Sequence, residues 1–340
     1  MKRTILSLAA AAALFSALPA FSAEAEVATS LELLGAYYPP NLGGYGISGF
    51  APVDFSQVPG NLLLGERDLG SGWGGAEAKA VLSRSWTIPA LRGEGAFTSG
   101  NSLELKAQAE FSPVSLNAAF SATLTPVAFL KLTGGAAVGT GWNVGFLGLC
   151  LNPPSDTQDY VQQSFGGAVW RAWGSGTFQF DLAALLPGDW NHVVLVASPS
   201  VEYKAYTGAA SGQAWLWEAD QGMNFNGAKL KATYFLGYQM PLVLDTVGFL
   251  LETEEWIGEV RDYSFMASTG GWGSDFVALN FGPLLNFRLG DKASLAVLVQ
   301  FKTARKWTDL TTRKRYFGNR DYEGSYLYFN RVALNCSLEL

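Results

Sequence analysis

His192 is the only histidine in the chain, and imidazole is the side chain best suited to move a proton near neutral pH. Ser198 and Ser200 follow it at even spacing and, with a histidine, could supply the nucleophile of a lipid hydrolase. On one extended strand these serines lie too far along the chain to bond His192, although a serine on a neighbouring strand could reach it. We therefore expect a structural role for His192 and no catalytic residue, and a single histidine excludes a multi-histidine metal site.

Clustered carboxylates are the second group of residues able to do chemistry, because their oxygens bind Ca²⁺. Asp156 and Asp159 lie in one predicted loop, whereas Glu252, Glu254 and Glu255 crowd the end of a predicted strand. Neither group has the spacing of an EF-hand loop, and no glycine-rich segment has the residues of a phosphate-binding loop. We interpret both groups as solvated ends of extracellular loops, and we expect neither a metal nor a cofactor.

The largest set of charges alternates with apolar residues along extended segments. In the segment 102–111, Glu104, Lys106 and Glu110 share one face, while leucine, alanine and phenylalanine side chains occupy the other. Successive residues of a strand point to opposite faces, so the segment has one polar and one apolar face. Charged residues at such inner positions would line either a narrow polar pore or a salt-bridged interior. This predicted pore-lining row consists of Glu104, Lys106, Glu110, Asp181, Glu202, Lys204, Lys229, Lys231, Arg288, Lys302, Arg331 and Glu339.

The segment 1–23 has the pattern of a secretory signal peptide, with basic Lys2 and Arg3, a short apolar stretch and small residues behind it. We expect cleavage between Ser22 and Ala25, which leaves 24–340 as a single domain. No later run of 18 apolar residues occurs, so transmembrane helices are excluded. An exported membrane protein without helical spans must be a closed β-barrel, because only closure satisfies every backbone group in lipid.

The composition agrees with that interpretation. The chain has 39 glycines, 14 % aromatic and only 15 % charged residues, which suits many turns and an outer surface in lipid. Without the signal peptide, 21 basic residues face 29 acidic ones, and this net negative charge disfavours nucleic-acid binding. Cys150 and Cys336 are too few for a disulfide framework, and we expect them to be free.

Long and short connections alternate along the chain, as they do in bacterial barrels with short periplasmic turns and long extracellular loops. They predict about twelve transmembrane antiparallel strands in up-and-down order, within a range of ten to fourteen, and both termini in the periplasm. The segment 39–75 is predicted as a long loop or partial plug, and 166–173 as loop or an extra strand. The predicted strands are 28–38, 76–87, 102–111, 114–123, 127–138, 175–186, 192–206, 228–238, 243–256, 274–288, 293–304 and 325–340.

Three stretches of the chain resemble predicted outer-membrane barrel proteins of spirochaetes. They are residues 116–143, which include Thr125-Pro126-Val127-Ala128-Phe129-Leu130, residues 177–192, and residues 235–241. These families are largely uncharacterised, so the resemblance implies an outer-membrane location and a barrel fold but no substrate. The chain departs from the pattern of well-studied outer-membrane barrels in ending at Leu340 instead of an aromatic residue read by the barrel-assembly machinery.

These observations favour a porin-like channel for small hydrophilic solutes. The alternative is a non-conducting surface barrel, adhesin-like or structural, whose extracellular loops bind a partner. An outer-membrane lipid hydrolase centred on His192 is less favoured, because no nucleophile is placed beside it. The expected partners are outer-membrane lipid, the barrel-assembly machinery and small polar solutes, with no nucleic acid.

Overall fold

The computed structural model describes residues 25–38, 75–144, 148–151, 161–213, 215–218, 224–262, 276–309 and 320–340. The predicted signal peptide and residues 39–74 of the predicted loop lie outside this part of the chain. No helix in the described ranges is long and apolar enough to cross a membrane. Twelve long strands form the wall: β1 (Glu26–Tyr38), β2 (Gly75–Pro89), β3 (Ser102–Ser112), β4 (Ser115–Val127), β5 (Leu130–Gly141), β8 (Val169–Asp181), β9 (His192–Tyr206), β11 (Gly227–Gln239), β12 (Leu244–Ile257), β13 (Ala278–Arg288), β14 (Ala293–Asp309) and β15 (Arg320–Glu339).

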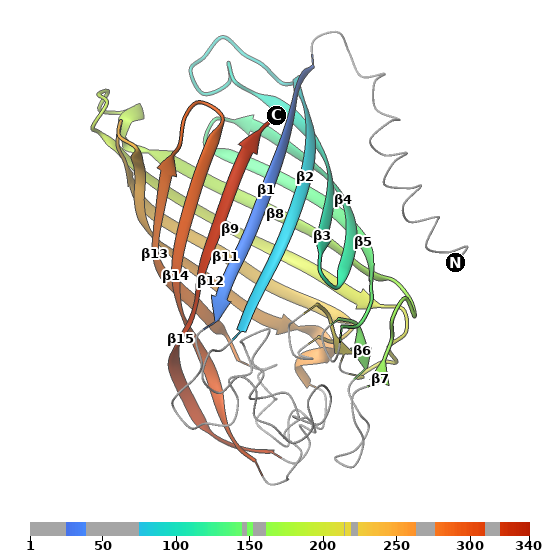
Figure 1. Cartoon of the computed structure of the whole chain (residues 1–340). Helices are drawn as coiled ribbons and strands as arrows, with labels where there is room; N and C mark the ends of the chain where they lie inside the picture. Colours follow the sequence, from blue (N-terminus) through green and yellow to red (C-terminus); the bar gives the residue numbers. More distant parts are fainter. Residues whose placement is uncertain are drawn as a thin grey trace.

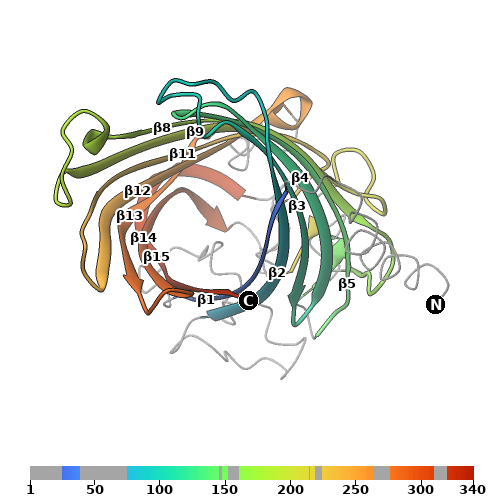
Figure 2. The ribbon, with the colours of Figure 1, turned by 90° about the horizontal axis from the view of Figure 1, so that it is seen from above.

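The twelve strands form a closed barrel in which each strand pairs antiparallel with the one before it in the wall (Figures 1 and 2). The barrel closes where β1 pairs with β15, with Ser30 opposite Glu339 and Leu33 opposite Cys336. Closure leaves no strand edge unpaired, so the backbone groups of the wall bond to one another. The predicted twelve-stranded antiparallel barrel is thereby confirmed.

The two ends of the barrel differ in their connections. One end carries the turns at 128–129, 240–243 and 289–292 and the C-terminal residue, and we call it the short-turn end (Figure 1). The opposite end, the long-loop end, carries β6 (Cys150–Leu151) and β7 (Val161–Gln162) in the connection from β5 to β8. The short turn after Ser112 also lies at the long-loop end, as the alternation requires.

Two local features differ from the sequence-based expectation. Residues 169–173 are neither a loop nor an extra strand but the beginning of β8, which ends at Asp181 instead of 186. There the Asp181 carboxylate accepts the Ala183 N–H at 3.0 Å and caps a 3₁₀ turn, which ends the strand. In addition, β6 and β7 join β10 (Trp215–Leu216) in a small three-stranded sheet that was not predicted.

The register gives the wall two chemically different faces. On the outer face, Leu236, Phe249 and Leu334 are 56 %, 49 % and 47 % exposed. Ring contacts join Phe249, Phe281, Phe301 and Phe329 across β12 to β15 on that same face. Residues of the opposite parity face the interior, because Glu110 on β3 meets Arg171 on β8 across two intervening strands and Arg171 in turn pairs with Glu202. A wall with an apolar exterior and a polar interior is the pattern of a barrel that spans lipid.

Candidate functional site

A belt of ion pairs and hydrogen bonds follows the inner wall of the barrel. We call it the charge belt, and it includes residues of β2, β3, β8, β9, β11, β12, β14 and β15. Its members are Glu77, Lys79, Glu110, Arg171, Glu202, Lys229, Lys231, Glu252, Glu254, Gln300 and Arg331.

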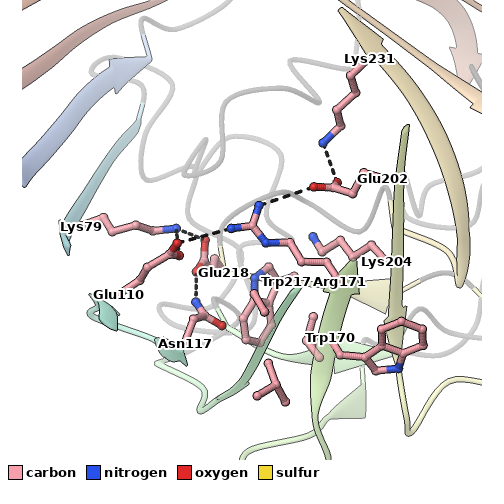
Figure 3. A pocket seen from close by; sticks show the side chains of 13 residues that line it. Lys79, Glu110, Asn117, Trp170, Arg171, Glu202, Lys204, Trp217, Glu218 and Lys231 are labelled. Atoms are coloured by element: carbon pink, nitrogen blue, oxygen red, sulfur yellow. Dashed lines mark hydrogen bonds and ion pairs between the residues drawn. The ribbon is translucent and has the colours of Figure 1, made fainter. Parts of the chain in front are cut away.

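The first half of the charge belt centres on Arg171. Its guanidinium lies 3.4 Å from Glu110 Oε1 and 3.5 Å from Glu202 Oε2 (Figure 3). Because β4 and β5 separate β3 from β8 in the wall, the bridge from Arg171 to Glu110 runs across the inside of the barrel. Lys79 Nζ extends the row to β2, 3.6 Å from Glu110 Oε2, and Lys231 Nζ extends it to β11, 2.6 Å from Glu202 Oε1.

The second half of the belt returns to β2. The Glu254 carboxylate forms ion pairs with Lys229 Nζ at 2.7 Å and with Lys231 Nζ at 3.9 Å. Two residues earlier on the same strand, Glu252 accepts a hydrogen bond from Gln300 at 2.7 Å. Gln300 Oε1 in turn accepts from Arg331 at 2.6 Å, and Arg331 lies 3.5 Å from Glu77, two residues from Lys79. The belt is therefore continuous around the lumen, and a solute that passes through the barrel has to pass it.

A cavity of about 190 Å³ lies inside the first half of the belt, lined by Lys79, Arg171, Glu202 and Lys231 among others (Figure 3). Glu218 reaches this cavity from the connection between β9 and β11. Its carboxylate accepts hydrogen bonds from Ser115 Oγ at 2.6 Å, from Lys79 Nζ at 3.3 Å and from Asn117 Nδ2 at 3.3 Å. A connection at the long-loop end thus folds back into the lumen, and we call these three contacts the Glu218 clasp.

The clasp holds Glu218 as a carboxylate. Burial alone would raise the pKa of this carboxyl group, but the Lys79 ammonium and the Ser115 hydroxyl more than offset that effect and keep its pKa below the usual value. The residue also has φ 59°, a left-handed conformation that costs about 1 kcal/mol for a residue other than glycine. The three contacts offset that cost.

An apolar cluster also holds the connection that carries Glu218. Trp215 and Trp217 are buried against Leu149, Val169 and Tyr206, which joins two connections of the long-loop end in one apolar cluster. The backbone N–H of Gly148 donates to the carbonyl of Glu218 at 2.7 Å. Aromatic packing therefore positions the loop, and the clasp fixes its tip in the lumen.

Trp173 packs on the inner wall directly over Gly135, and it supports Arg171, whose guanidinium lies 4.9 Å from the ring centroid. A Cβ on Gly135 would lie 2.3 Å from the Trp173 ring, whereas one on neighbouring Gly134 would meet nothing closer than 4.0 Å. We expect Gly135→Ala to displace the indole and Arg171 and to lower the free energy of unfolding by about 2 kcal/mol. Urea unfolding in detergent micelles measures this loss, with Gly134→Ala as the control. Equal stability of the two variants would contradict the packing argument.

A second cavity, of about 410 Å³, opens at the short-turn end. Asp245, Arg288, Asp291, Lys292 and Glu339 line it. Arg288 lies 3.5 Å from Asp245, and its side chain is 61 % exposed. This end therefore carries side chains of both charge signs.

The structure brings together part of the residue row predicted from the sequence. Glu110, Glu202, Lys229, Lys231 and Arg331 meet in the charge belt. The other predicted members also face the interior, and of these Lys204 lines the cavity inside the belt. Arg288 and Glu339 lie at the short-turn mouth, Asp181 at the same rim, Glu104 and Lys106 on β3, Lys204 beside Trp215 and Asn224, and Lys302 opposite Asn280.

The sequence-based interpretation of Glu252 and Glu254 as solvated loop ends is wrong. Both lie inside β12 and point into the lumen, and only Glu255, paired with Arg261 at 3.4 Å, faces outward near the rim. Their parity relative to the apolar residues of the strand would have revealed this. Lys79, Arg171 and Glu218 were also missed. The carboxylates Asp156 and Asp159 lie outside the described residues.

His192 Nδ1–H donates a hydrogen bond to the Asp181 carboxylate across β8 and β9, with Nδ1 2.7 Å from Oδ2. Ser198 bonds Thr177 at 2.7 Å, and Ser200 Oγ donates to the Lys231 carbonyl at 3.5 Å, so neither hydroxyl is directed at His192. In the described ranges no group of three or more His, Cys, Asp or Glu could hold a metal ion. These contacts favour a structural role for His192 at the rim.

This role makes a specific prediction for His192→Ala. Because His192 and Asp181 are each about one third exposed, we expect the loss of their hydrogen bond to lower the free energy of unfolding by less than about 1 kcal/mol. We also expect no lipid hydrolysis from either the wild type or the variant, measured on phospholipid micelles. Hydrolysis by the wild type that the substitution removes would restore the hydrolase interpretation.

No protein-family model and no curated protein sequence matches the chain. Solved structures that resemble it over 93 % of its length include three barrels of low similarity. One, from work on the asymmetric conductivity of engineered proteins, is 7 % identical over all of that chain, with a TM-score of 0.26. OccK11 (OpdR) of Pseudomonas aeruginosa is 10 % identical over 96 % of its chain, with a TM-score of 0.23, and the P. aeruginosa outer membrane protein opdK is 9 % identical over 98 %, with a TM-score of 0.21. These values support no statement about the function of this chain.

Proposed function

We propose that the chain is an outer-membrane channel that passes small hydrophilic solutes through the charge belt. The apolar outer face supports the membrane location, because hydrocarbon is the solvent that such a face requires. The short-turn end would lie in the periplasm together with both termini of the mature chain. Membership of the spirochaete family that the chain resembles remains a prediction. Recognition by the barrel-assembly machinery remains a prediction as well.

The observation that carries the proposal is the charge belt, whose ion pairs and hydrogen bonds surround the lumen. Ionised side chains inside a barrel must pair or meet water. Glu110 meets Arg171 across two intervening strands, and Glu202 and Glu254 pair with lysines of the neighbouring strand β11, so the ionised groups of the belt are paired. Rings of charged side chains are a common means by which pores discriminate between ions.

Planar-bilayer recordings of the purified chain test the proposal. We expect discrete conductance steps, and we expect Lys229→Glu to shift the reversal potential in a salt gradient toward the cation potential, because it places a second carboxylate beside Glu254. A conducting wild type with an unchanged reversal potential in the variant would contradict the role of the belt. Failure to conduct would contradict the channel itself.

A non-conducting surface barrel is the second candidate, and the Glu218 clasp favours it. A loop that folds into the lumen and bonds the belt narrows the path, while the rest of the long-loop end is free to bind a partner. Under this alternative, recordings show no steps although the chain is folded, as heat-dependent gel migration in detergent would establish. Protease cleavage between 207 and 213 on intact cells would place the long-loop end outside.

A further inference from the structure

Arg84 is an exception to the chemistry of the outer face. Within the described side chains of the twelve wall strands, the only charged residues on that face are Arg84 and Glu255, and Glu255 is paired with Arg261 near the rim. Arg84 lies within β2 opposite Thr29 and Ala107, whereas Ser83, next to it, points into the lumen and accepts a hydrogen bond from Gln108. Its side chain is exposed, and no carboxylate of the described residues pairs with it.

The neighbours of Arg84 show in which direction its side chain extends. The guanidinium lies 5.7 Å from the ring centroid of Trp86, a residue nearer to the end of the strand at Pro89. The cation is therefore drawn toward the short-turn end, as expected of a side chain that extends from hydrocarbon toward the headgroup layer. Pro89 lies five positions beyond Arg84, which corresponds to about 12 Å along the barrel axis for a tilted strand.

Thr29 supplies a second polar group on the outer face, beside Arg84. It is the direct cross-strand neighbour of Arg84 on β1, and directly opposed side chains have Cβ atoms about 5 Å apart. The guanidinium and this hydroxyl thus lie side by side on a wall whose other neighbours, including Leu31 and Leu82, are apolar, whereas the Trp86 indole beside the guanidinium is buried at 4 % exposure. A phosphate diester accepts hydrogen bonds from the two donors, and the apolar residues suit the acyl chains attached to it.

We propose that Arg84 and Thr29 bind the phosphate headgroup of a phospholipid in the leaflet at the short-turn end, with buried Trp86 positioning the Arg84 guanidinium. This inference rests on the membrane placement in the proposed function, not on conduction. A phospholipid is preferred over a protein partner because an unpaired cation in this position meets headgroup phosphate wherever the barrel spans a bilayer. The bound lipid would neutralise Arg84 without any conformational change in the wall.

Native mass spectrometry of the folded chain in neutral detergent tests the site, with phosphatidylglycerol and the phosphate-free lipid diacylglycerol as probes. We expect the wild type to retain phosphatidylglycerol in preference to diacylglycerol, Arg84→Leu to lose at least fivefold of that retention, and Arg84→Lys to keep part of it. Leu82→Met, on the same face of β2, is the matched control and should behave as the wild type. Millimolar inorganic phosphate should not displace the lipid.

Equal retention by the wild type and Arg84→Leu would overturn the proposal, as would displacement by inorganic phosphate, which would indicate a simple anion site. Self-association of the wild type that Arg84→Leu abolishes would instead assign the residue to a protein interface. Bilayer recordings of the same preparations separate this inference from the channel. Conductance with equal lipid retention refutes the lipid site alone, and specific lipid retention without conductance refutes the channel alone.

Discussion

Replacing Glu202 with glutamine is expected to shift the channel toward anions by about fivefold in permeability ratio. Glu202 pairs with Arg171 at 3.5 Å and with Lys231 at 2.6 Å, and the substitution leaves both cations with a neutral amide between them. The extra positive charge in the charge belt corresponds to about 1 kcal/mol of discrimination after screening by water and salt. No other single change in the belt removes a carboxylate that bridges two cations so closely.

The same substitution should also destabilise the barrel. The Glu202 side chain is only 11 % exposed, and loss of one partner from a largely buried pair leaves the other charges uncompensated. Because the lumen is hydrated, we expect a loss of about 1–2 kcal/mol in the free energy of unfolding, less than in a dry core. Reversal potentials in a salt gradient and urea unfolding in micelles measure the two effects.

Glu104→Gln is the matched control for Glu202→Gln. Glu104 faces the same interior from β3, opposite Thr87 and Thr123, and removal of its charge leaves the charge belt intact. We expect a much smaller shift in selectivity and no loss of stability from this change. If the two variants change selectivity equally, the discrimination arises from the overall charge of the lumen, and the belt has no special role.

The sidedness of the wall could be predicted from the sequence because strand geometry has a period of two. Along 102–111, for example, one parity holds Glu104, Lys106 and Glu110, and the structure places all three on the inner face. The same reasoning applied to 252–255 would have placed Glu252 and Glu254 inside. Three glutamates so close together are typical of a solvated loop end, but the alternation of the strand places Glu252 and Glu254 on its inner face.

The course of the charge belt could not be predicted, since three of its contacts, Arg171–Glu110, Gln300–Glu252 and Arg331–Glu77, join strands that are not neighbours. Arg171 meets Glu110 across two intervening strands, a contact that depends on the curvature and shear of the closed wall. Arg171 was also missed because the start of β8 was predicted six residues late. Glu218 depends on how a long connection packs, through buried Trp215 and Trp217, and no periodic pattern in the sequence encodes that packing.

Replacing Glu218 with glutamine is expected to release the loop tip from the lumen and to raise the fraction of time that the channel spends at its highest conductance. The amide can still accept from Ser115, but it loses the ion pair with Lys79 and the charge that strengthens the other contacts. A loss of about 1.5 kcal/mol raises the population of the undocked loop about tenfold. Glu94→Gln, an exposed change in the connection at the opposite end, is the control.

Acid should reproduce the effect of Glu218→Gln in the wild type. The folded-state pKa of Glu218 is lowered, so the clasp contributes its full stability above the unfolded-state value of 4.5 and loses it only as pH falls through the lower folded-state value. The loop tip should therefore stay docked from neutral pH down to 4.5 and undock below it. Single-channel recordings from neutral pH to below pH 4.5 should show a rise in conductance below pH 4.5 in the wild type and in Glu94→Gln. This rise is superimposed on the titration of other carboxylates. Glu218→Gln should lack that rise because its amide does not titrate, and an identical acid response in all three proteins would show that Glu218 does not close the path.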